Sequence, residues 1–367
     1  MIDRASLATC RRIVVKIGSR ILQDDLGGRV AMLAEQAAWL RERKIELVLV
    51  SSGAIALGVA ALGLAKRPTE LAGLQAAAAV GQGRLIQVYQ QAFAQQRIAI
   101  GQVLLTHDDV RDRRRYLNAR LTFAELLRLG ALPIVNENDT VSVDEIKFGD
   151  NDRLAALVTS LVSADLLVIL TDVEGLYDRD PRDGGTLLHE VGDIEAVRGG
   201  AGGTSSGVGT GGMLSKVDAA AIASRFGVPT VVASGNADAP LRRILEGETI
   251  GTVFWPQVER LAARKHWIAY ALKPRGRIVV DAGAKKALVD GQKSLLPSGI
   301  RAVHGSFEVG DPVELIDETN SIFARGLCAL AADEIAKIAG KKGADAAALL
   351  GYPAPSVAVH RDDLVIL

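Results

Sequence analysis

Cysteine is scarce in this chain, and long apolar runs are missing. Only two cysteines, Cys10 and Cys328, occur among 367 residues, too few and too far apart for a disulfide framework or a thiolate metal site. The chain begins MIDRASLATCRRIVVKIG, without an apolar signal core, and no stretch approaches the ~20 apolar residues that span a bilayer. We therefore expect a cytoplasmic protein, in a reducing compartment, that makes no contact with a membrane.

An excess of charge of either sign is also missing. The 43 basic and 43 acidic side chains cancel, which removes any global argument for a polyanionic partner or an anionic membrane surface. Small anionic ligands remain compatible with this balance. The apolar share of 49% supplies a sizeable core, and the length predicts two domains, one of them large.

Residues 11–235 predict a mostly parallel sheet. Short β-branched runs alternate there with longer helical patterns, which is typical of parallel strands joined by crossover helices. Several runs are apolar on both faces, as strands covered by helices on each side should be. The fold class that we expect is therefore α/β, with three layers. The predicted strands are residues 13–17, 47–50, 98–104, 132–135, 166–170 and 229–233, and the predicted helices are residues 28–44, 71–96, 116–129, 153–163 and 216–226.

The pattern changes around residues 256–275, where two prolines bracket a segment that no crossover unit follows. Beyond it, short strand-like runs are separated by glycine and proline turns, with one helix near residues 331–338. We therefore expect a large domain over residues 1–260 and a small β-rich domain over residues 275–353. The predicted strands of the small domain are residues 277–280, 299–303, 313–316 and 322–329.

Two candidate ligand-binding segments directly follow predicted strands, where open α/β sheets hold their ligands. In VVKIGS, Lys16 precedes a turn of Gly18 and Ser19 that can present backbone N–H groups to a phosphate. In SSGAIALG, glycine lets the backbone approach a ligand, and Ser52 adds a hydroxyl donor. One such segment would mean little, and the recurrence is what indicates a site.

A third segment holds two polar clusters, NEND at residues 136–139 and GDND at residues 149–152. A single Asp or Asn of this kind is a common helix N-cap. Two clusters that flank one loop suggest recognition of an amino acid, because carboxylates accept from an ammonium group and amides donate to a carboxylate.

A fourth pair of segments is LTDVEGLY, residues 170–177, and GTGGMLSK, residues 209–216. Consecutive glycines before a helix, followed by a hydroxyl and a lysine, make a backbone cradle for phosphates with a cation at the β/γ side. The surrounding glycine-rich stretch, residues 199–212, favours a ligand loop over a linker. The Walker A spacing is absent, and no G-x-G-x-x-G follows the first strand, which disfavours a dinucleotide fold.

In order and spacing, the tracts VVKIG, SSGAIALG, NENDTV, EIKFGDND, LTDVEGLY and GTGGMLSK resemble the glutamate 5-kinase family of the amino-acid kinase superfamily, over nearly the whole chain. The region after residue 275 looks like the PUA domain appended to many bacterial members. The resemblance implies an amino-acid kinase fold and an enzyme that uses ATP and Mg²⁺ to phosphorylate the γ-carboxylate of L-glutamate. The product would be γ-glutamyl phosphate, the first intermediate on the route to proline.

The resemblance also implies partners. They are L-glutamate and ATP as substrates, proline as a feedback inhibitor, and further copies of the chain in a homo-oligomer, with a tetramer expected. Because an acyl phosphate is short-lived in water, we also expect a weak contact with the γ-glutamyl phosphate reductase that consumes the product.

Carried over residue by residue, the resemblance assigns three kinds of role. Lys16 and Lys216 become the catalytic, phosphate-binding cations, with Asp152 between them as an organising carboxylate. Glutamate is assigned to Ser52, Asp139 and Asn151. The nucleotide is assigned to Lys16, Gly18, Ser19, Thr171, Asp172, Thr210, Gly211, Gly212, Met213, Leu214, Ser215 and Lys216. The residues that coordinate Mg²⁺ are left unassigned.

Two positions depart from the family pattern. Arg20 stands where the family usually has a small residue, and Leu214 stands where Ser or Thr is more frequent. We expect neither to contact a residue with an assigned polar role, so the effect should be confined to local loop geometry.

Two alternatives stay open. Another superfamily member, acting on aspartate, N-acetylglutamate or carbamate, would share most of the phosphate machinery, although the clusters around Asp139 and Asn151 favour glutamate. An RNA-binding protein is a different class, because PUA domains resemble modules of RNA-modifying enzymes and residues 111–115 form a basic run. Residues 275–353 hold ten basic and ten acidic side chains, so they lack the net positive field that a phosphate backbone needs. RNA is therefore not expected as a partner.

Overall fold

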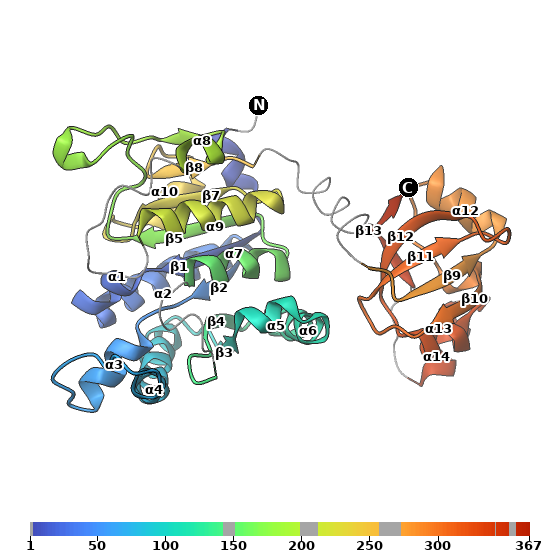
Figure 1. Ribbon diagram of the computed structural model, residues 1–367, viewed down its shortest axis with the longest axis horizontal. Coiled ribbons are helices and arrows are strands. Elements are labelled where there is room, and N and C mark those ends of the chain that lie inside the picture. The colour runs from blue at the N-terminus through green and yellow to red at the C-terminus, as the bar shows by residue number, and fades with distance from the viewer. Residues whose placement is uncertain (1–2, 142–150, 199–211, 257–272, 342, 352–356) are drawn as a thin grey trace. The chain divides into compact units, whose positions relative to one another are not determined.

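The chain divides after residue 257 into two units, Met1–Gln257 and Val258–Leu367. The computed structural model describes residues 3–141, 151–198, 212–256, 273–341, 343–351 and 357–367 (Figure 1). Residue 260, the predicted end of the large domain, lies outside the described residues, so that boundary stays a prediction. No helix in the described ranges is both long and apolar enough to cross a bilayer.

The first unit is built around an eight-stranded sheet with the order β3-β4-β2-β1-β5-β7-β8-β6. The six predicted strands are confirmed, and each pairs in parallel with at least one neighbour in the sheet. Two short strands were not predicted, and β8 runs antiparallel to β7. The strands are β1 Arg12–Ile17, β2 Glu46–Val50, β3 Ile100–Leu105, β4 Leu132–Glu137, β5 Leu166–Thr171, β6 Glu190–Val191, β7 Thr230–Ser234 and β8 Thr252–Phe254.

Helices cover both faces of this sheet, which gives the three layers predicted (Figure 1). Alternate residues of β1 enter different cores: Val15 packs with one helix layer, and Val14 packs with the other. This explains why the strands are apolar on both faces. One layer contains η1 Arg4–Thr9, α1 Ser19–Asp24, α2 Leu26–Glu42, α3 Ala54–Ala61, α4 Leu71–Gln95 and α10 Pro240–Leu245. The other contains α5 His107–Arg111, α6 Arg113–Arg128, α7 Asn151–Leu161, α8 Ile194–Arg198 and α9 Met213–Arg225.

The second unit has its own sheet and its own hydrophobic core. The strand order is β10-β9-β11-β12-β13, antiparallel except where β11 pairs with β9. The four predicted strands and the predicted helix are confirmed. The last strand pairs with β12 and lies beyond residue 353, the predicted end of this domain. The elements are β9 Gly276–Val280, α12 Ala282–Val289, η5 Pro297–Gly299, β10 Ile300–Gly305, β11 Pro312–Ile316, β12 Ile322–Cys328, α13 Ala332–Ile338, α14 Gly343–Leu350 and β13 Val359–Ile366.

Two glycines let α3 pack against α4 at backbone distance. A Cβ at Gly58 would lie 1.7 Å from the carbonyl oxygen of Ala77, and a Cβ at Gly81 would lie 1.8 Å from that of Ala54. Ala54 begins α3 directly after Gly53, whose φ of +100° is left-handed. The close helix contact therefore fixes the turn that follows β2.

We expect Gly81→Ala to lower the melting temperature by several degrees, because the added methyl group overlaps a backbone oxygen that cannot rotate aside. Gly83, in the same helix, has no atom within 4 Å of its Cβ position. Gly83→Ala should instead stabilise the helix by about 0.5–1 kcal/mol. Thermal denaturation of both variants checks this, and equal melting temperatures would contradict the close packing.

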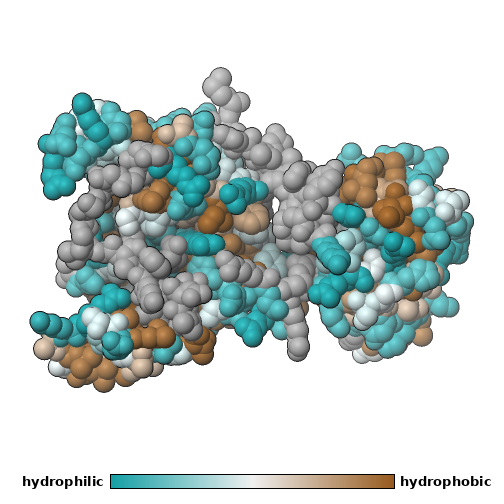
Figure 2. All heavy atoms as spheres, viewed as in Figure 1, coloured by the Kyte–Doolittle hydropathy of each residue, from teal (hydrophilic) through white to brown (hydrophobic). Residues whose placement is uncertain are grey.

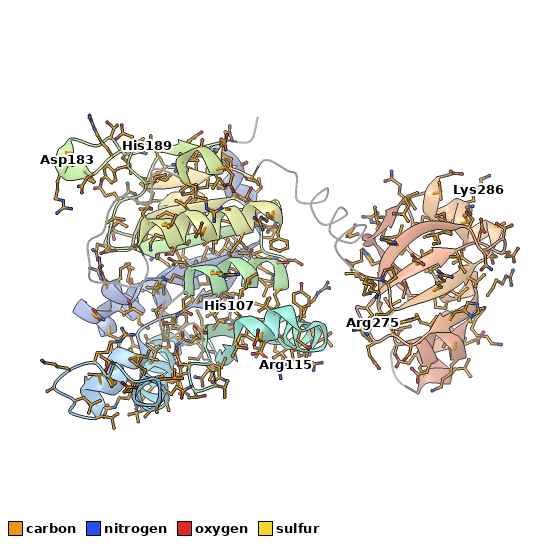
Figure 3. The ribbon with its side chains drawn as sticks, in the orientation of Figure 1. His107, Arg115, Asp183, His189, Arg275 and Lys286 are labelled. Carbon is orange, nitrogen blue, oxygen red and sulfur yellow. The ribbon has the colours of Figure 1, made fainter. Side chains whose placement is uncertain are left out.

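Arg4 ties the start of the first unit to its far sheet edge. Its guanidinium donates to the carbonyl oxygens of His189, Glu248, Ile250 and Gly251, at 2.6, 3.2, 2.9 and 3.1 Å. His189, labelled in Figure 3, directly precedes β6 at this edge. A buried arginine with four carbonyl acceptors has most of its donors satisfied, so η1 is held firmly against β6 and β8.

Candidate active site

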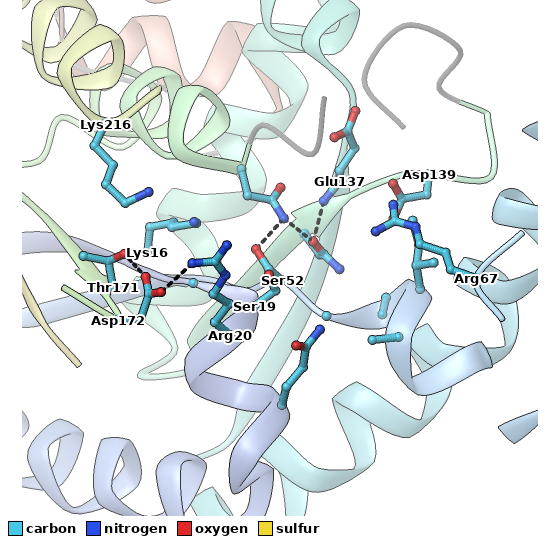
Figure 4. Close-up of a pocket in the computed structure, with 18 residues that line it drawn as sticks. Lys16, Ser19, Arg20, Ser52, Arg67, Glu137, Asp139, Thr171, Asp172 and Lys216 are labelled. Carbon is cyan, nitrogen blue, oxygen red and sulfur yellow. Dashed lines mark hydrogen bonds and ion pairs between the residues drawn. The ribbon is translucent and has the colours of Figure 1, made fainter. Parts of the chain in front are cut away.

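A pocket opens at the carboxyl ends of β1, β2, β4 and β5 (Figure 4). These strands are neighbours in the sheet and run parallel, so their carboxyl ends meet at one edge, where open α/β sheets bind ligands. Each is followed by one of the polar segments noted in the sequence. The lining residues are Lys16, Gly18, Ser19, Arg20, Gln23, Ser52, Gly53, Ala54, Ile55, Ala56, Arg67, Asn136, Glu137, Asp139, Asn151, Thr171, Asp172 and Lys216.

Asp152, in the first turn of α7, lies between two lysines. The Nζ of Lys16 is 2.6 Å from Oδ1 of Asp152, and the Nζ of Lys216 is 3.1 Å from Oδ2. All three side chains are buried. Lys16 comes from β1 and Lys216 from the first turn of α9, so one carboxylate holds together two cations that are 200 positions apart.

The charges of this cluster shape its ionisation. Burial alone would raise the pKa of Asp152, but Lys16 and Lys216 outweigh burial and hold the pKa well below its ordinary value. Burial lowers the pKa of Lys216, and the charge of Asp152 opposes that decrease. Asp152 is therefore ionised at neutral pH. Two ammonium groups against one carboxylate leave an excess of positive charge beside the pocket, which suits a phosphoryl group.

The predicted first phosphate turn lies against the end of β5. The N–H of Gly18 donates to the carbonyl oxygen of Leu170 at 2.9 Å, and a Cβ at Gly18 would lie 3.3 Å from the same oxygen. Ser19 begins α1. The Oγ1 of Thr171 is 3.0 Å from Oδ1 of Asp172. The structure thus brings these predicted nucleotide residues together along one side of the pocket.

The start of α9 supplies the opposite side. Gly212 is its N-cap, and Met213 is its first residue. The Oγ of Ser215 donates to Oδ2 of Asp152 at 2.7 Å, while Leu214 is 41% exposed. Ser215 therefore helps to hold the carboxylate that orients the lysines. The remaining predicted residues of this loop, Thr210 and Gly211, lie outside the described residues.

Arg20 does contact a residue with an assigned polar role, so the expectation of a purely local effect was wrong. Its Nη1 is 2.7 Å from Oδ2 of Asp172. Burial would raise the pKa of Asp172, but the hydrogen bonds from Arg20 and Thr171 bring it below the ordinary value. The pair joins residues 152 positions apart, and it depends on the adjacency of β1 and β5 rather than on any local pattern.

Asn151 connects the second polar cluster to the serine turn. Its Nδ2 is 2.9 Å from the carbonyl oxygen of Ser51, 2.9 Å from Oγ of Ser52 and 3.0 Å from Oδ1 of Asn136. These acceptors fix the orientation of the amide. The Oδ1 of Asn151 is buried and has no hydrogen-bond donor in the part of the chain that the structure describes. Buried polar atoms are normally satisfied, so a ligand with an N–H group would fit here.

Asp139 lies farther along the pocket, beside Arg67 (Figure 4). Burial raises the pKa of Asp139 to about 6, and the charge of Arg67 opposes this rise. The sequence reasoning missed Arg67, which comes from the segment between α3 and α4 and has no local signal. It gave no role to Asn136 or Glu137, although both belong to the NEND cluster, and it missed Gln23 of α1.

The pocket thus has two ends. Lys16 and Lys216 lie at one end in Figure 4, Asp139 and Arg67 lie at the other, and Ser52 lies between them. The residues assigned to glutamate share this pocket with the two lysines. Their individual roles stay a prediction.

Comparisons with known proteins identify the family to which each part of the chain is similar. The model of the amino acid kinase family matches residues 11–234, and that of the PUA domain matches residues 276–350. The glutamate 5-kinase of Myxococcus xanthus is 53% identical over 99% of this chain and 98% of that protein, and that of Salinispora arenicola is 50% identical over 100% of both. Among solved structures, UMP kinase from Bacillus anthracis has a TM-score of 0.48 and 14% identity, over 68% of this chain and 97% of that chain. On the family model and these full-length relatives, the chain belongs to the amino acid kinase family, among the glutamate 5-kinases.

Proposed function

We propose that the protein transfers the γ-phosphoryl group of ATP to the side-chain carboxylate of L-glutamate and forms γ-glutamyl phosphate, the first step towards proline. The observation that carries this is a pocket with the Lys16–Asp152–Lys216 cluster at one end and a carboxylate beside a guanidinium, Asp139 and Arg67, at the other. Full-length relatives named glutamate 5-kinase support the same substrate.

Management of charge is the main task in this reaction. A glutamate carboxylate has an ordinary pKa of about 4.3 and is already a nucleophile at neutral pH, so no general base is needed. One carboxylate oxygen attacks the γ-phosphorus, the bond from phosphorus to the bridging oxygen of ADP breaks, and ADP leaves with that electron pair. Both reactants are anions, and they must approach in line. Lys16 and Lys216 stabilise the negative charge on the transferring oxygens, while Asp152 orients the lysines.

Mg²⁺ supplies further charge neutralisation on the nucleotide phosphates. Mg²⁺ usually keeps several waters and binds through phosphates plus one or two carboxylates. No group of three or more His, Cys, Asp or Glu side chains arranged for a metal ion occurs among the described residues. Of the carboxylates that line the pocket, Asp172 lies beside the proposed phosphate site, and we assign it as the residue that would contact the hydrated ion.

Trapping of the product tests the function. Purified protein with ATP, Mg²⁺, glutamate and hydroxylamine should yield the hydroxamate of the γ-carboxylate. Aspartate and N-acetylglutamate, tested in parallel for hydroxamate formation and for ADP release, should react much more slowly than glutamate. Carbamate, tested for ADP release alone, should also react much more slowly. Absence of product with glutamate, or a faster reaction with another acid, would overturn the assignment.

The pH dependence of substrate binding follows from Asp139. Its pKa is raised to about 6 by burial, against the charge of Arg67, so the carboxylate is ionised at pH 7.5 and loses its charge as the pH falls through 6. If Asp139 binds the ammonium group, the KM for glutamate should rise below pH 6 by up to about tenfold per unit. The KM for ATP should change much less.

Arg67, whose charge acts on Asp139, and a second carboxylate, Glu137, line the same pocket. The effect of Asp139 therefore has to be distinguished from that of Glu137. Asp139→Asn should raise the KM for glutamate at pH 7.5 and abolish the rise below pH 6. A variant that keeps the wild-type pH profile would remove Asp139 from this role.

The second unit should be dispensable for the chemistry. Every residue that lines the pocket belongs to the first unit, and each unit has its own core. A chain that ends at Ala263 should therefore keep kcat within about tenfold of the full-length value. Sensitivity to proline or assembly should change if the second unit biases an inhibited or oligomeric state. A folded but inactive truncated chain would place essential support for the site in the second unit.

Regulation and assembly are further proposals. Feedback inhibition by proline, a cytoplasmic location, a homo-tetramer and a weak contact with the reductase are supported by the family resemblance. Self-association is also supported by exposed apolar side chains along the α3–α4 pair, at Leu62, Leu64 and Val80 (Figure 2), because such patches often mark interfaces. Sedimentation of the purified protein measures the number of chains in the oligomer. A coupled assay compares the rate of the reductase reaction when both enzymes share one solution with the rate when they are kept separate, which tests direct transfer.

A further inference from the structure

Arg67 is a cation at the end of the pocket opposite to the lysine cluster. It comes from the segment between α3 and α4, and Asp139 follows β4. In Figure 4 the two side chains lie together, and the charge of Arg67 acts on Asp139. Arg67 makes no hydrogen bond with another side chain or carbonyl in the described ranges. Its guanidinium therefore has donors available for a ligand.

The neighbouring groups define the ligand chemistry. Asn151 presents a buried Oδ1 that has no donor among the described residues, while its Nδ2 donates towards three acceptors. Asp139 presents a carboxylate. This end of the pocket thus offers the Asp139 carboxylate as an acceptor for an ammonium group and, next to it, the planar guanidinium of Arg67, while the amide of Asn151 lies beside Ser52, between the two ends. An ammonium group has three donors and no acceptor, whereas a carboxylate pairs with a guanidinium fork in two parallel hydrogen bonds.

We propose that Arg67 is a specificity-determining residue that binds the α-carboxylate of the amino-acid substrate, beside the Asp139 site for the α-ammonium group. This inference rests on the proposed function and adds to it the recognition of the α-carbon end. A zwitterion placed across Arg67 and Asp139 keeps both charges paired. Its side-chain carboxylate then extends past Ser52 towards Lys16 and Lys216, at the other end of the pocket.

Arg67 could instead act only on the charge of Asp139, and analogues that lack one charged group separate the two roles. 4-Aminobutyrate is glutamate without the α-carboxylate, and glutarate is glutamate without the ammonium group. Both keep the carboxylate that would be phosphorylated. The kcat/KM of each is measured from hydroxamate formation, or a competitive inhibition constant against glutamate is used where turnover is too slow.

The wild-type protein should prefer glutamate to 4-aminobutyrate by about 10²-fold or more, because the missing α-carboxylate leaves Arg67 without its partner. In Arg67→Gln this preference should fall to within about threefold, while the preference for glutamate over glutarate stays as in the wild type. Arg67→Lys should restore part of the first preference. In Asp139→Asn the preference for glutamate over glutarate should be lost instead, while the preference for glutamate over 4-aminobutyrate stays as in the wild type.

Lys66→Gln is the matched control, because Lys66 is the adjacent exposed cation and does not line the pocket. It should leave both preferences unchanged. If Arg67→Gln weakens glutamate and 4-aminobutyrate by the same factor, or shifts the comparison with glutarate instead, the assignment of Arg67 to the α-carboxylate is overturned. A wild-type protein that yields no hydroxamate from glutamate would overturn the proposed function itself, and the inference with it.

Discussion

Replacing Lys216 with alanine should lower kcat by about 10²-fold or more while the protein stays folded. The Nζ of Lys216 is 3.1 Å from Asp152, and the side chain is buried beside the pocket. A fixed cation in a buried site stabilises charge that develops in the transition state, and the loss of one such donor typically costs about 10²–10³ in kcat. The KM for glutamate should change less, because the groups proposed to hold its α-carbon end lie at the other end of the pocket.

The hydroxamate assay measures this loss, and thermal denaturation checks the fold. Lys216→Arg keeps the charge but changes its shape, so it should recover part of the rate. Lys337→Ala, which removes an exposed lysine of the second unit, is the control and should have the wild-type rate. Turnover near the wild-type value in Lys216→Ala would exclude Lys216 from phosphoryl transfer.

Asp152→Asn should damage both activity and stability. Asp152 is the anion between Lys16 and Lys216, and its removal leaves two buried ammonium groups that repel each other. Loss of one partner from a buried ion pair costs about 3–5 kcal/mol. We therefore expect a marked fall in melting temperature at neutral pH and a loss of kcat of about 10²-fold or more, since neither lysine keeps its position.

The stability that Asp152→Asn loses should depend on pH in a defined direction. The pKa of Asp152 lies below its ordinary value in the folded protein, so its stabilisation is present above the ordinary pKa and is lost only as the pH falls through the folded pKa. The variant should approach wild-type stability at high pH, where Lys216, whose pKa burial lowers, loses its proton. Asp172→Asn removes a partly exposed carboxylate and should cost at most about 1 kcal/mol. Equal melting temperatures for the two variants would contradict a structural role for the cluster.

The site could largely be read from the sequence because its parts follow strands. Lys16, Ser52, Asp139 and Asp172 each come soon after or near the end of a buried strand, and parallel neighbours bring such ends together. Strands alternate with helical segments along this unit, so the polar segments that follow the parallel strands meet at one edge of the sheet. The same regularity made the six parallel strands and their helices predictable.

What the sequence did not reveal depends on tertiary contacts. Arg67 lies in an irregular segment between helices, where no periodicity marks the direction of a side chain. The pairing of Arg20 with Asp172 requires that β1 and β5 be neighbours. The strands β6 and β8 have two and three residues, too short for a period of two to be recognised. The strand β13 reads VHRDDLVI, and its charged centre hides a strand that pairs with β12.

The contacts of Arg4 set the order in which the first unit can mature during synthesis. The carbonyl groups that satisfy Arg4 belong to residues 189 to 251, so they are synthesised 185 to 247 positions after it. Contacts of such long sequence separation form late, because the intervening chain must already be ordered. We therefore expect η1 to stay accessible to proteases until β8 has formed, so that protection of η1 would report a complete first unit.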